Sequence, residues 1–249
     1  MLLHGYLSSK EAFFHQIEYF SRFYRVTAFD FLGFGHTVPL TKPFSVGDYA
    51  AWTTETLRAL GVRKPHVIAH SFGCRVAVKM AAENGDAFEK ILLTGAAGVV
   101  LKRSLAYHCK VRAYRLVRRF APQYAEKKFG SAEYRTLSPI MKESYKKIVN
   151  EDLRACARRI KNEVLIVQGD RDTVTPMKEA RAYLDCFARG RLRVMGGGHF
   201  AFVDDPVAFN LIAEEFLYDS VQSDSERDNG VSVLLGDPEN AWGDAAKRL

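Results

Sequence analysis

The sequence lacks several features that would assign it to a special class of protein. Its longest apolar run, residues 91–101, is too short and too rich in Gly and Ala to cross a bilayer. No basic segment leads into an apolar stretch at the start, so we expect no secretory leader. The cysteines have no C-x-x-C spacing, which argues against a zinc site or a disulfide framework and favours reduced thiols in a cytoplasmic protein. They are Cys74, Cys109, Cys156 and Cys186.

Charge is present but unevenly distributed. Residues 101–161 contain 17 Lys/Arg and 5 Asp/Glu, whereas the rest of the chain contains 19 basic and 24 acidic residues. Such a basic segment fits an anionic substrate or peripheral contact with an anionic membrane surface, and it fits equally well a set of solvated helices that bind nothing. Nucleic acid is not expected as a partner, because no recognised binding motif accompanies the charge.

Strand-like apolar runs alternate with helical patterns through most of the 249 residues. This alternation predicts an α/β fold, with a mostly parallel sheet covered by helices on both faces. The core of the fold would comprise residues 1–98 and 161–218. Residues 99–160 are helical and basic, without a strand pattern, and are expected to be an insertion. Residues 219–249 are polar and are expected to be a disordered tail. Strands are expected at the apolar start of the chain and at 25–30, 67–69, 90–94, 164–168 and 192–195.

Ser71 lies between a short apolar strand and a helical run, with Ala69 two residues before it and Gly73 two residues after it. Small residues at these positions are needed where a strand and a helix approach closely, and a serine on such a tight turn has strained backbone geometry. The pattern is that of a nucleophile elbow, with Ala in place of the usual first Gly. Taken alone, a serine before a helix is more often a plain N-cap than a nucleophile.

A serine nucleophile needs a histidine base that is oriented by a carboxylate. Of the seven histidines, His199 follows the last expected strand in a Gly-rich loop, so it would reach the same sheet edge as Ser71. Asp170 and Asp172 follow the preceding strand and are both candidates for the acid, although Asp beside Gly is also common in ordinary turns. The order Ser, Asp, His along the chain is the order expected for an elbow-type triad.

Together these motifs resemble those of the α/β-hydrolase superfamily over nearly all of residues 1–218. In the acid loop of that family the second Asp is the triad member, which selects Asp172. The segments that carry the resemblance are 4–6 (His-Gly-x oxyanion turn), 30–35 (D-x-x-G-x-G loop), 69–73 (elbow), 169–172 (acid loop), and 198–199 with 205–206 (terminal G-H-x(n)-[ED]-P signature).

The resemblance implies that Ser71 attacks a carbonyl, His199 moves the proton and Asp172 holds the imidazole. The backbone amides of Tyr6 and Phe72 would bind the oxyanion. Residues 99–160 would be a helical cap that covers the pocket and selects the substrate. We expect no cofactor and no metal.

The start of the chain departs from the family pattern. Family members usually carry some tens of residues that form two antiparallel edge strands before the His-Gly turn. Here Met1 falls inside the third strand, so the first two edge strands are expected to be missing. Residues 25–30 would then be an exposed sheet edge.

The substrate is indicated only by charge. Arg75 lies one helical turn after Ser71, where it could bind a substrate carboxylate in a bidentate manner or form a salt bridge within the sheet–helix interface. The first hypothesis is a serine hydrolase that cleaves a carboxylic ester, or a C–C bond next to a ketone as the meta-cleavage-product hydrolases do, in a small anionic substrate. An alternative is a lyase similar to 2-succinyl-6-hydroxy-2,4-cyclohexadiene-1-carboxylate synthase, which has an arginine at the position that matches Arg75. A non-catalytic, ligand-binding relative is the third hypothesis.

Overall fold

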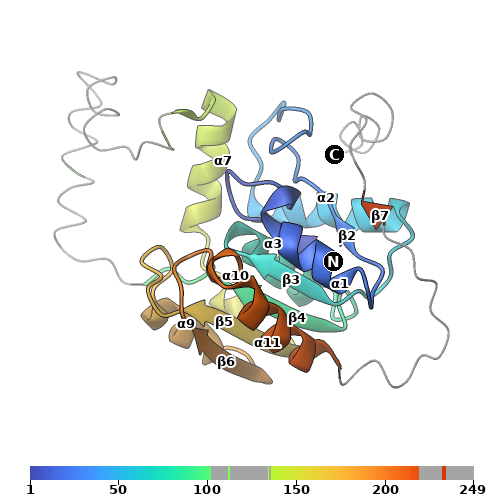
Figure 1. The fold of residues 1–249 in the computed structure, drawn as a ribbon. Helices are drawn as coiled ribbons and strands as arrows, with labels where there is room; N and C mark the ends of the chain where they lie inside the picture. Colours follow the sequence, from blue (N-terminus) through green and yellow to red (C-terminus); the bar gives the residue numbers. More distant parts are fainter. Residues whose placement is uncertain (102–111, 113–133, 135, 219–231, 234–249) are drawn as a thin grey trace.

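A computed structural model of the chain describes residues 1–101, 112, 134, 136–218 and 232–233 (Figure 1). The described residues form a sheet with the strand order β6-β5-β4-β3-β1-β2-β7. Every neighbouring pair in this sheet is parallel, as the alternating pattern predicts. The strands are β1 (Leu2–Leu3), β2 (Thr27–Ala28), β3 (Val67–His70), β4 (Lys90–Thr94), β5 (Glu163–Gly169), β6 (Gly190–Met195) and β7 (Ser232–Val233).

Helices cover both faces of the sheet (Figure 1). One face packs against α1, α10 and α11, and the other packs against α2, α3 and α9. Helix α7 extends beyond the sheet, above the ends of the strands in the view of Figure 1. The bounds are η1 (Lys10–Phe13), α1 (Phe14–Phe20), α2 (Val46–Ala59), α3 (Phe72–Glu83), α7 (Pro139–Asn150), α8 (Arg154–Ala157), α9 (Met177–Leu184), α10 (Ala201–Asp204) and α11 (Pro206–Tyr218).

The central strands are buried on both faces, which explains their continuous apolar sequences. In β3, Val67 and Ala69 belong to the core on the α2–α3 side, whereas Ile68 belongs to the core on the α1–α11 side. Leu92 of β4 and Leu165 of β5 face the same side as Ile68. Successive side chains of a strand point to opposite faces, so each central strand contributes to both cores.

Two elements differ from the sequence expectation. The strand expected at 25–30 is only Thr27–Ala28, because its neighbours β1 and β7 each offer two residues for pairing. The helical spacing of apolar residues predicts a helix over 10–20. This helix begins as a 3-10 turn, where the Lys10 amide donates to the Asp30 carboxylate at 2.7 Å. The sequence Ser-Val-Gly-Asp at 45–48 resembles a capping box and predicts a helix start there. The structure has this box, since Ser45 and Asp48 each accept from the backbone amide of the other.

The structure describes only part of the expected cap and part of the expected tail. Within 99–160 the structure describes α7 and α8, whereas residues 102–111, 113–133 and 135 lie outside the described residues. In the tail, residues 219–231 and 234–249 also lie outside them, and the two described residues form β7 beside β2. None of the helices in the described part of the chain is long and apolar enough to span a bilayer.

The parallel arrangement brings four strand ends to one edge of the sheet. His70 of β3 is in register with Thr94 of β4, and Gly169 of β5 is in register with Met195 of β6. The residues that come after β3, β5 and β6 therefore meet at this edge, although they are far apart in the sequence. Ser71, Asp172 and His199 lie on those three connections.

Candidate active site

Ser71 joins β3 directly to α3 and has an unusual backbone conformation, with φ 49° and ψ −106°. A positive φ is unfavourable for a residue with a side chain, so the surrounding structure must hold it in place. The Ser71 amide donates to the Thr94 carbonyl at 3.0 Å, which ties the turn to β4. A Cβ atom at Gly73 would lie 2.3 Å from the Leu3 carbonyl oxygen. The close approach of α3 to β1 therefore requires glycine, as the motif predicts.

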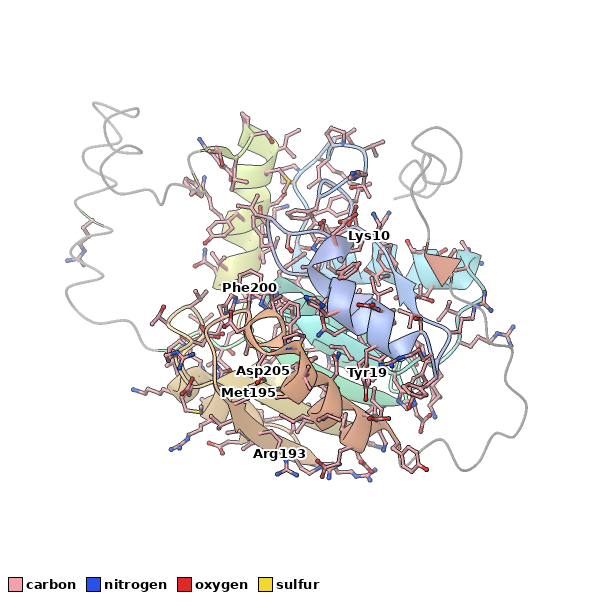
Figure 2. The ribbon with its side chains drawn as sticks, viewed as in Figure 1. Lys10, Tyr19, Arg193, Met195, Phe200 and Asp205 are labelled. Carbon is pink, nitrogen blue, oxygen red and sulfur yellow. The ribbon has the colours of Figure 1, made fainter. Side chains whose placement is uncertain are left out.

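His199 lies on the loop between β6 and α10, which Met195 and Phe200 bracket in Figure 2. Its Nδ1 atom is 2.9 Å from Asp172 Oδ2, the carboxylate on the loop after β5. Gly95, after β4, makes room for the imidazole, because a Cβ there would lie 3.0 Å from ring atoms of His199. The structure thus brings the predicted acid and base together from 27 residues apart.

The Asp172 carboxylate is held by hydrogen bonds on both oxygens. Oδ1 accepts from the amides of Val174 and Thr175, while Oδ2 accepts from Thr175 Oγ1 at 2.7 Å and Gln168 Nε2 at 3.1 Å. Burial raises the pKa of Asp172, but the hydrogen bonds from His199 and Thr175 outweigh it and hold the pKa well below its usual range. An ionised carboxylate only accepts, so His199 Nδ1 donates to Asp172 Oδ2. In a neutral imidazole with this tautomer, Nε2 is the nitrogen that can accept a proton.

Two other histidines near the turn are fixed by burial and hydrogen bonds. His70 Nε2 donates to the His199 backbone carbonyl at 3.0 Å, and burial lowers the pKa of His70 to about 3. His4 Nε2 accepts from the Phe31 amide at 2.9 Å, and burial lowers the pKa of His4 to about 4. Both rings are therefore neutral near pH 7, and His70 supports the loop that carries His199.

A cavity of about 710 Å³ opens at this sheet edge. Both Ser71 and His199 line it. Within the described residues no hydrogen bond joins Ser71 to His199; such contacts are often long before a substrate binds. In the same part of the chain, no hydrogen bond uses the backbone amides of Tyr6 and Phe72, the two predicted oxyanion donors, and both residues line the cavity.

Arg75 is buried on α3 and lines the same cavity. Its Nη1 atom donates to the Glu151 carbonyl at 2.8 Å. Burial lowers the pKa of Arg75, an effect that the nearby Tyr183 and Glu151 oppose. The expectation of a salt bridge inside the sheet–helix interface is not met within the described residues, where Arg75 forms no ion pair.

Several residues at the site were not identified from the sequence. Thr175 Oγ1 lies 3.2 Å from His199 Nδ1 as well as bonding Asp172, and Gln168 reaches Asp172 from the end of β5. Glu179 of α9 and Tyr145 of α7 line the cavity. The spacing Asp172-x-x-Thr175, which is typical of a turn closed by side-chain hydrogen bonds, could have indicated Thr175. The sequence has no comparable signal for the others.

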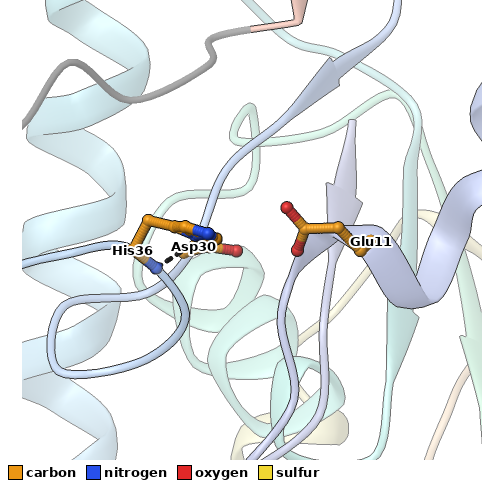
Figure 3. A group of neighbouring side chains, drawn as sticks. All are labelled: Glu11, Asp30 and His36. Atoms are coloured by element: carbon orange, nitrogen blue, oxygen red, sulfur yellow. Dashed lines mark hydrogen bonds between the residues drawn. The ribbon is translucent and has the colours of Figure 1, made fainter.

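One cluster outside the cavity has the composition of a metal site. Glu11, Asp30 and His36 offer ligand atoms that lie within 4.8 Å of one another (Figure 3). The Asp30 carboxylate is already bonded by the Lys10 amide, by Lys10 Nζ at 3.2 Å and by the His36 amide at 3.0 Å. These bonds supply the buried Asp30 carboxylate with partners and make it the anchor of the loop after β2.

The family of proteins described as "alpha/beta hydrolase fold" matches residues 1–131, more than half of the chain. The chain belongs to this family. The matched residues include the strand–turn–helix at Ser71 and the turn at Tyr6.

Relatives of this alpha/beta hydrolase include named enzymes. Over 215 residues it is 25% identical to 2-hydroxymuconate semialdehyde hydrolase of Pseudomonas putida, covering 78% of this chain and 76% of that protein. Over 91 residues it is 28% identical to (E)-2-((N-methylformamido)methylene)succinate hydrolase of Acinetobacter baylyi, so this match spans 36% of the chain and only 35% of that relative's length. Its fold is similar to that of an esterase from Exiguobacterium antarcticum, with a TM-score of 0.70, 22% identity and coverage of 87% of this chain and 90% of that chain.

Proposed function

We propose that the chain is a serine hydrolase in which Ser71, His199 and Asp172 form a catalytic triad. Its reaction is the cleavage of a carboxylic ester, or of a C–C bond next to a ketone, in a small anionic substrate. The observation that carries the proposal is the pairing of a strained Ser71 at the β3–α3 turn with a His199 whose Nδ1 is held 2.9 Å from Asp172 Oδ2. Membership of the alpha/beta hydrolase family supports the same chemistry.

The proposed mechanism uses the lone pair on His199 Nε2. Ser71 Oγ attacks the substrate carbonyl carbon while its proton passes to Nε2, and the oxyanion is bound by the amides of Tyr6 and Phe72. The bond between the carbonyl carbon and the leaving group then breaks, a C–O bond in an ester or a C–C bond in a ketone. His199 gives the proton to the leaving atom, which is the alkoxide oxygen or the carbanion carbon. Water attacks the acyl-Ser71 by the same route, so the acid is released and the enzyme is restored.

The anionic substrate is supported by the buried Arg75, which lines the cavity one turn beyond Ser71. A guanidinium suits a carboxylate because it offers two parallel donors. The two enzyme relatives are named for a substituted succinate and for 2-hydroxymuconate semialdehyde, which are carboxylate-bearing compounds. The cap proposed for residues 99–160 is supported by α7, whose Tyr145, Ile148 and Val149 line the cavity.

Covalent labelling tests the nucleophile. A fluorophosphonate should modify the wild-type chain, and peptide mass spectrometry should locate the adduct on Ser71. Ser71→Ala should not be labelled, whereas Ser21→Ala, a matched change at the exposed end of α1, should be labelled as fast as the wild type. A folded wild-type sample that stays unlabelled would refute the serine hydrolase and favour a non-catalytic relative.

The second candidate is a lyase similar to 2-succinyl-6-hydroxy-2,4-cyclohexadiene-1-carboxylate synthase, and the position of Arg75 next to the cavity is what favours it. Turnover of short p-nitrophenyl esters should be compared with turnover of the intermediate on which that synthase acts, using wild type and Arg75→Ala for each. Hydrolase chemistry predicts cleavage of the esters alone. Conversion of the intermediate without ester cleavage would assign the lyase.

A further inference from the structure

Two opposite charges line the cavity beside Ser71 without forming an ion pair. Arg75 comes from α3 and Glu179 from the first turn of α9. Each charge contributes to the pKa shift of the other. Within the described residues, however, neither forms a salt bridge. Both side chains line the same cavity.

Most N–H donors of the Arg75 guanidinium form no hydrogen bond with the described residues. One nitrogen bonds the backbone carbonyl of Glu151, whose side chain is paired with Lys79 at 3.0 Å. The Glu151 carboxylate therefore has its own cation. A guanidinium carries five N–H donors, and one bond to a carbonyl leaves most of them for a ligand.

The Glu179 carboxylate also has unused hydrogen-bonding capacity. Its carboxylate is partly buried and accepts no hydrogen bond from any described residue. Burial raises the pKa of Glu179, the Arg75 charge lowers it, and the Asp172 charge raises it again. A carboxylate in this position would repel a plain substrate carboxylate bound at Arg75. A hydrogen-bond donor beside that carboxylate would turn the repulsion into an attraction.

We propose that Arg75 and Glu179 together recognise a substrate whose acyl part ends in a carboxylate with a hydroxyl or ammonium group on the adjacent carbon. Arg75 binds the carboxylate and Glu179 accepts from the neighbouring donor. The inference rests on the proposed hydrolase function and makes its substrate class narrower. Glu179 acts here on specificity and takes no part in bond cleavage.

Four p-nitrophenyl esters with the same four-carbon acyl chain test the proposal. They are the butyrate, the succinate half-ester, and the esters of malate and aspartate at the carboxyl remote from the hydroxyl or amino group. The expected order of kcat/KM is malate or aspartate above succinate, and succinate above or near butyrate. A hydrogen bond to a charged group predicts a gain of about ten- to a hundredfold for the added donor. The malate and aspartate esters distinguish a hydroxyl from an ammonium ligand.

Glu179→Gln keeps the shape of the side chain and removes its charge. It should reduce the ratio of kcat/KM on the malate or aspartate ester to kcat/KM on the succinate ester by about tenfold or more. Glu55→Gln is a matched change on α2, where the exposed Glu55 side chain pairs only with Arg58 among the described residues. It should leave that ratio unchanged. Protection of Ser71 from fluorophosphonate by the free acids gives a second readout that needs no turnover, with malate or aspartate protecting at lower concentration than succinate.

Different results would refute the substrate-recognition proposal and the serine hydrolase proposal. If the wild type is labelled and cleaves butyrate but prefers neither malate nor aspartate to succinate, the recognition proposal is wrong and the hydrolase stands. An unchanged ratio in folded Glu179→Gln would also overturn it. If no ester is cleaved and Ser71 is not labelled, the proposed function itself fails.

Discussion

Asp172 and Glu179 are two carboxylates near one cavity, and their surroundings shift their pKa values in opposite directions. Asp172 receives hydrogen bonds on both oxygens, and its pKa is lowered. Glu179 receives none from the described residues, and burial together with the Asp172 charge raises its pKa. The contrast separates a carboxylate that hydrogen bonds hold in place from one that has no hydrogen-bond donor among the described residues. Carboxylates whose environments push their pKa values apart commonly have different roles at one site.

The largest effect is expected when the fixed carboxylate is removed. Asp172→Asn replaces the acceptor of His199 Nδ1 with an amide, which favours the wrong tautomer of the imidazole. We expect kcat to fall by about a thousand- to ten-thousandfold on every substrate. Steady-state kinetics on the butyrate ester would measure this. A fall of less than tenfold in a folded variant would mean that Asp172 does not orient the base.

A smaller effect is expected from the glycine that lets α3 approach β1. In Gly73→Ala the new methyl group meets the Leu3 carbonyl at 2.3 Å, so the turn must shift. We expect the free energy of unfolding to fall by roughly 1–3 kcal/mol, and the labelling of Ser71 to slow. Gly85→Ala is the matched control, because a Cβ at Gly85 has no atom within 4 Å. Urea unfolding of both variants measures the difference, and equal effects would contradict the close approach.

The smallest effects are expected in the pH dependence of stability, and they should have opposite signs. Folding lowers the pKa of Asp172, so its ionised form stabilises the fold above the unfolded value of about 3.9, and this contribution is lost as the pH falls through the folded pKa. Folding raises the pKa of Glu179, so its ionisation opposes folding near pH 7, and the penalty disappears below the unfolded value of about 4.3.

Thermal unfolding at about pH 7 and about pH 3 can separate the two carboxylates. Asp172→Asn should lower the Tm at the higher pH, and the difference from wild type should shrink at the lower pH. Glu179→Gln should raise the Tm slightly at the higher pH only. Changes of the same sign in the two variants would show that their environments do not differ as described.

Features that are local, or that depend only on the order of elements along the chain, could be predicted from the sequence. The apolar runs identified the central strands, and the small residues around Ser71 indicated the tight turn. The parallel sheet then explains why Asp172 and His199 meet, since residues after neighbouring parallel strands share one edge. The fold and the family are confirmed, whereas the catalytic roles of these residues stay predictions.

The wall of the cavity could not be predicted in the same way. Glu179 has an ordinary place in the first turn of a helix, and only the packing of α9 on the sheet places it at the cavity that Arg75 also lines. Which face of a helix meets a cavity depends on contacts between distant segments. The predicted length of β2 was wrong for a similar reason. A strand can extend only as far as its neighbours pair with it.

At Ser71 the residue that would best stabilise the backbone differs from the residue that the proposed chemistry needs. Glycine adopts φ 49° without the penalty that a side chain brings, so Ser71→Gly should leave a more stable fold. A search for thermostable variants that measured folding alone would therefore select against the proposed nucleophile. Selection for activity has to oppose that drift for as long as the serine is needed.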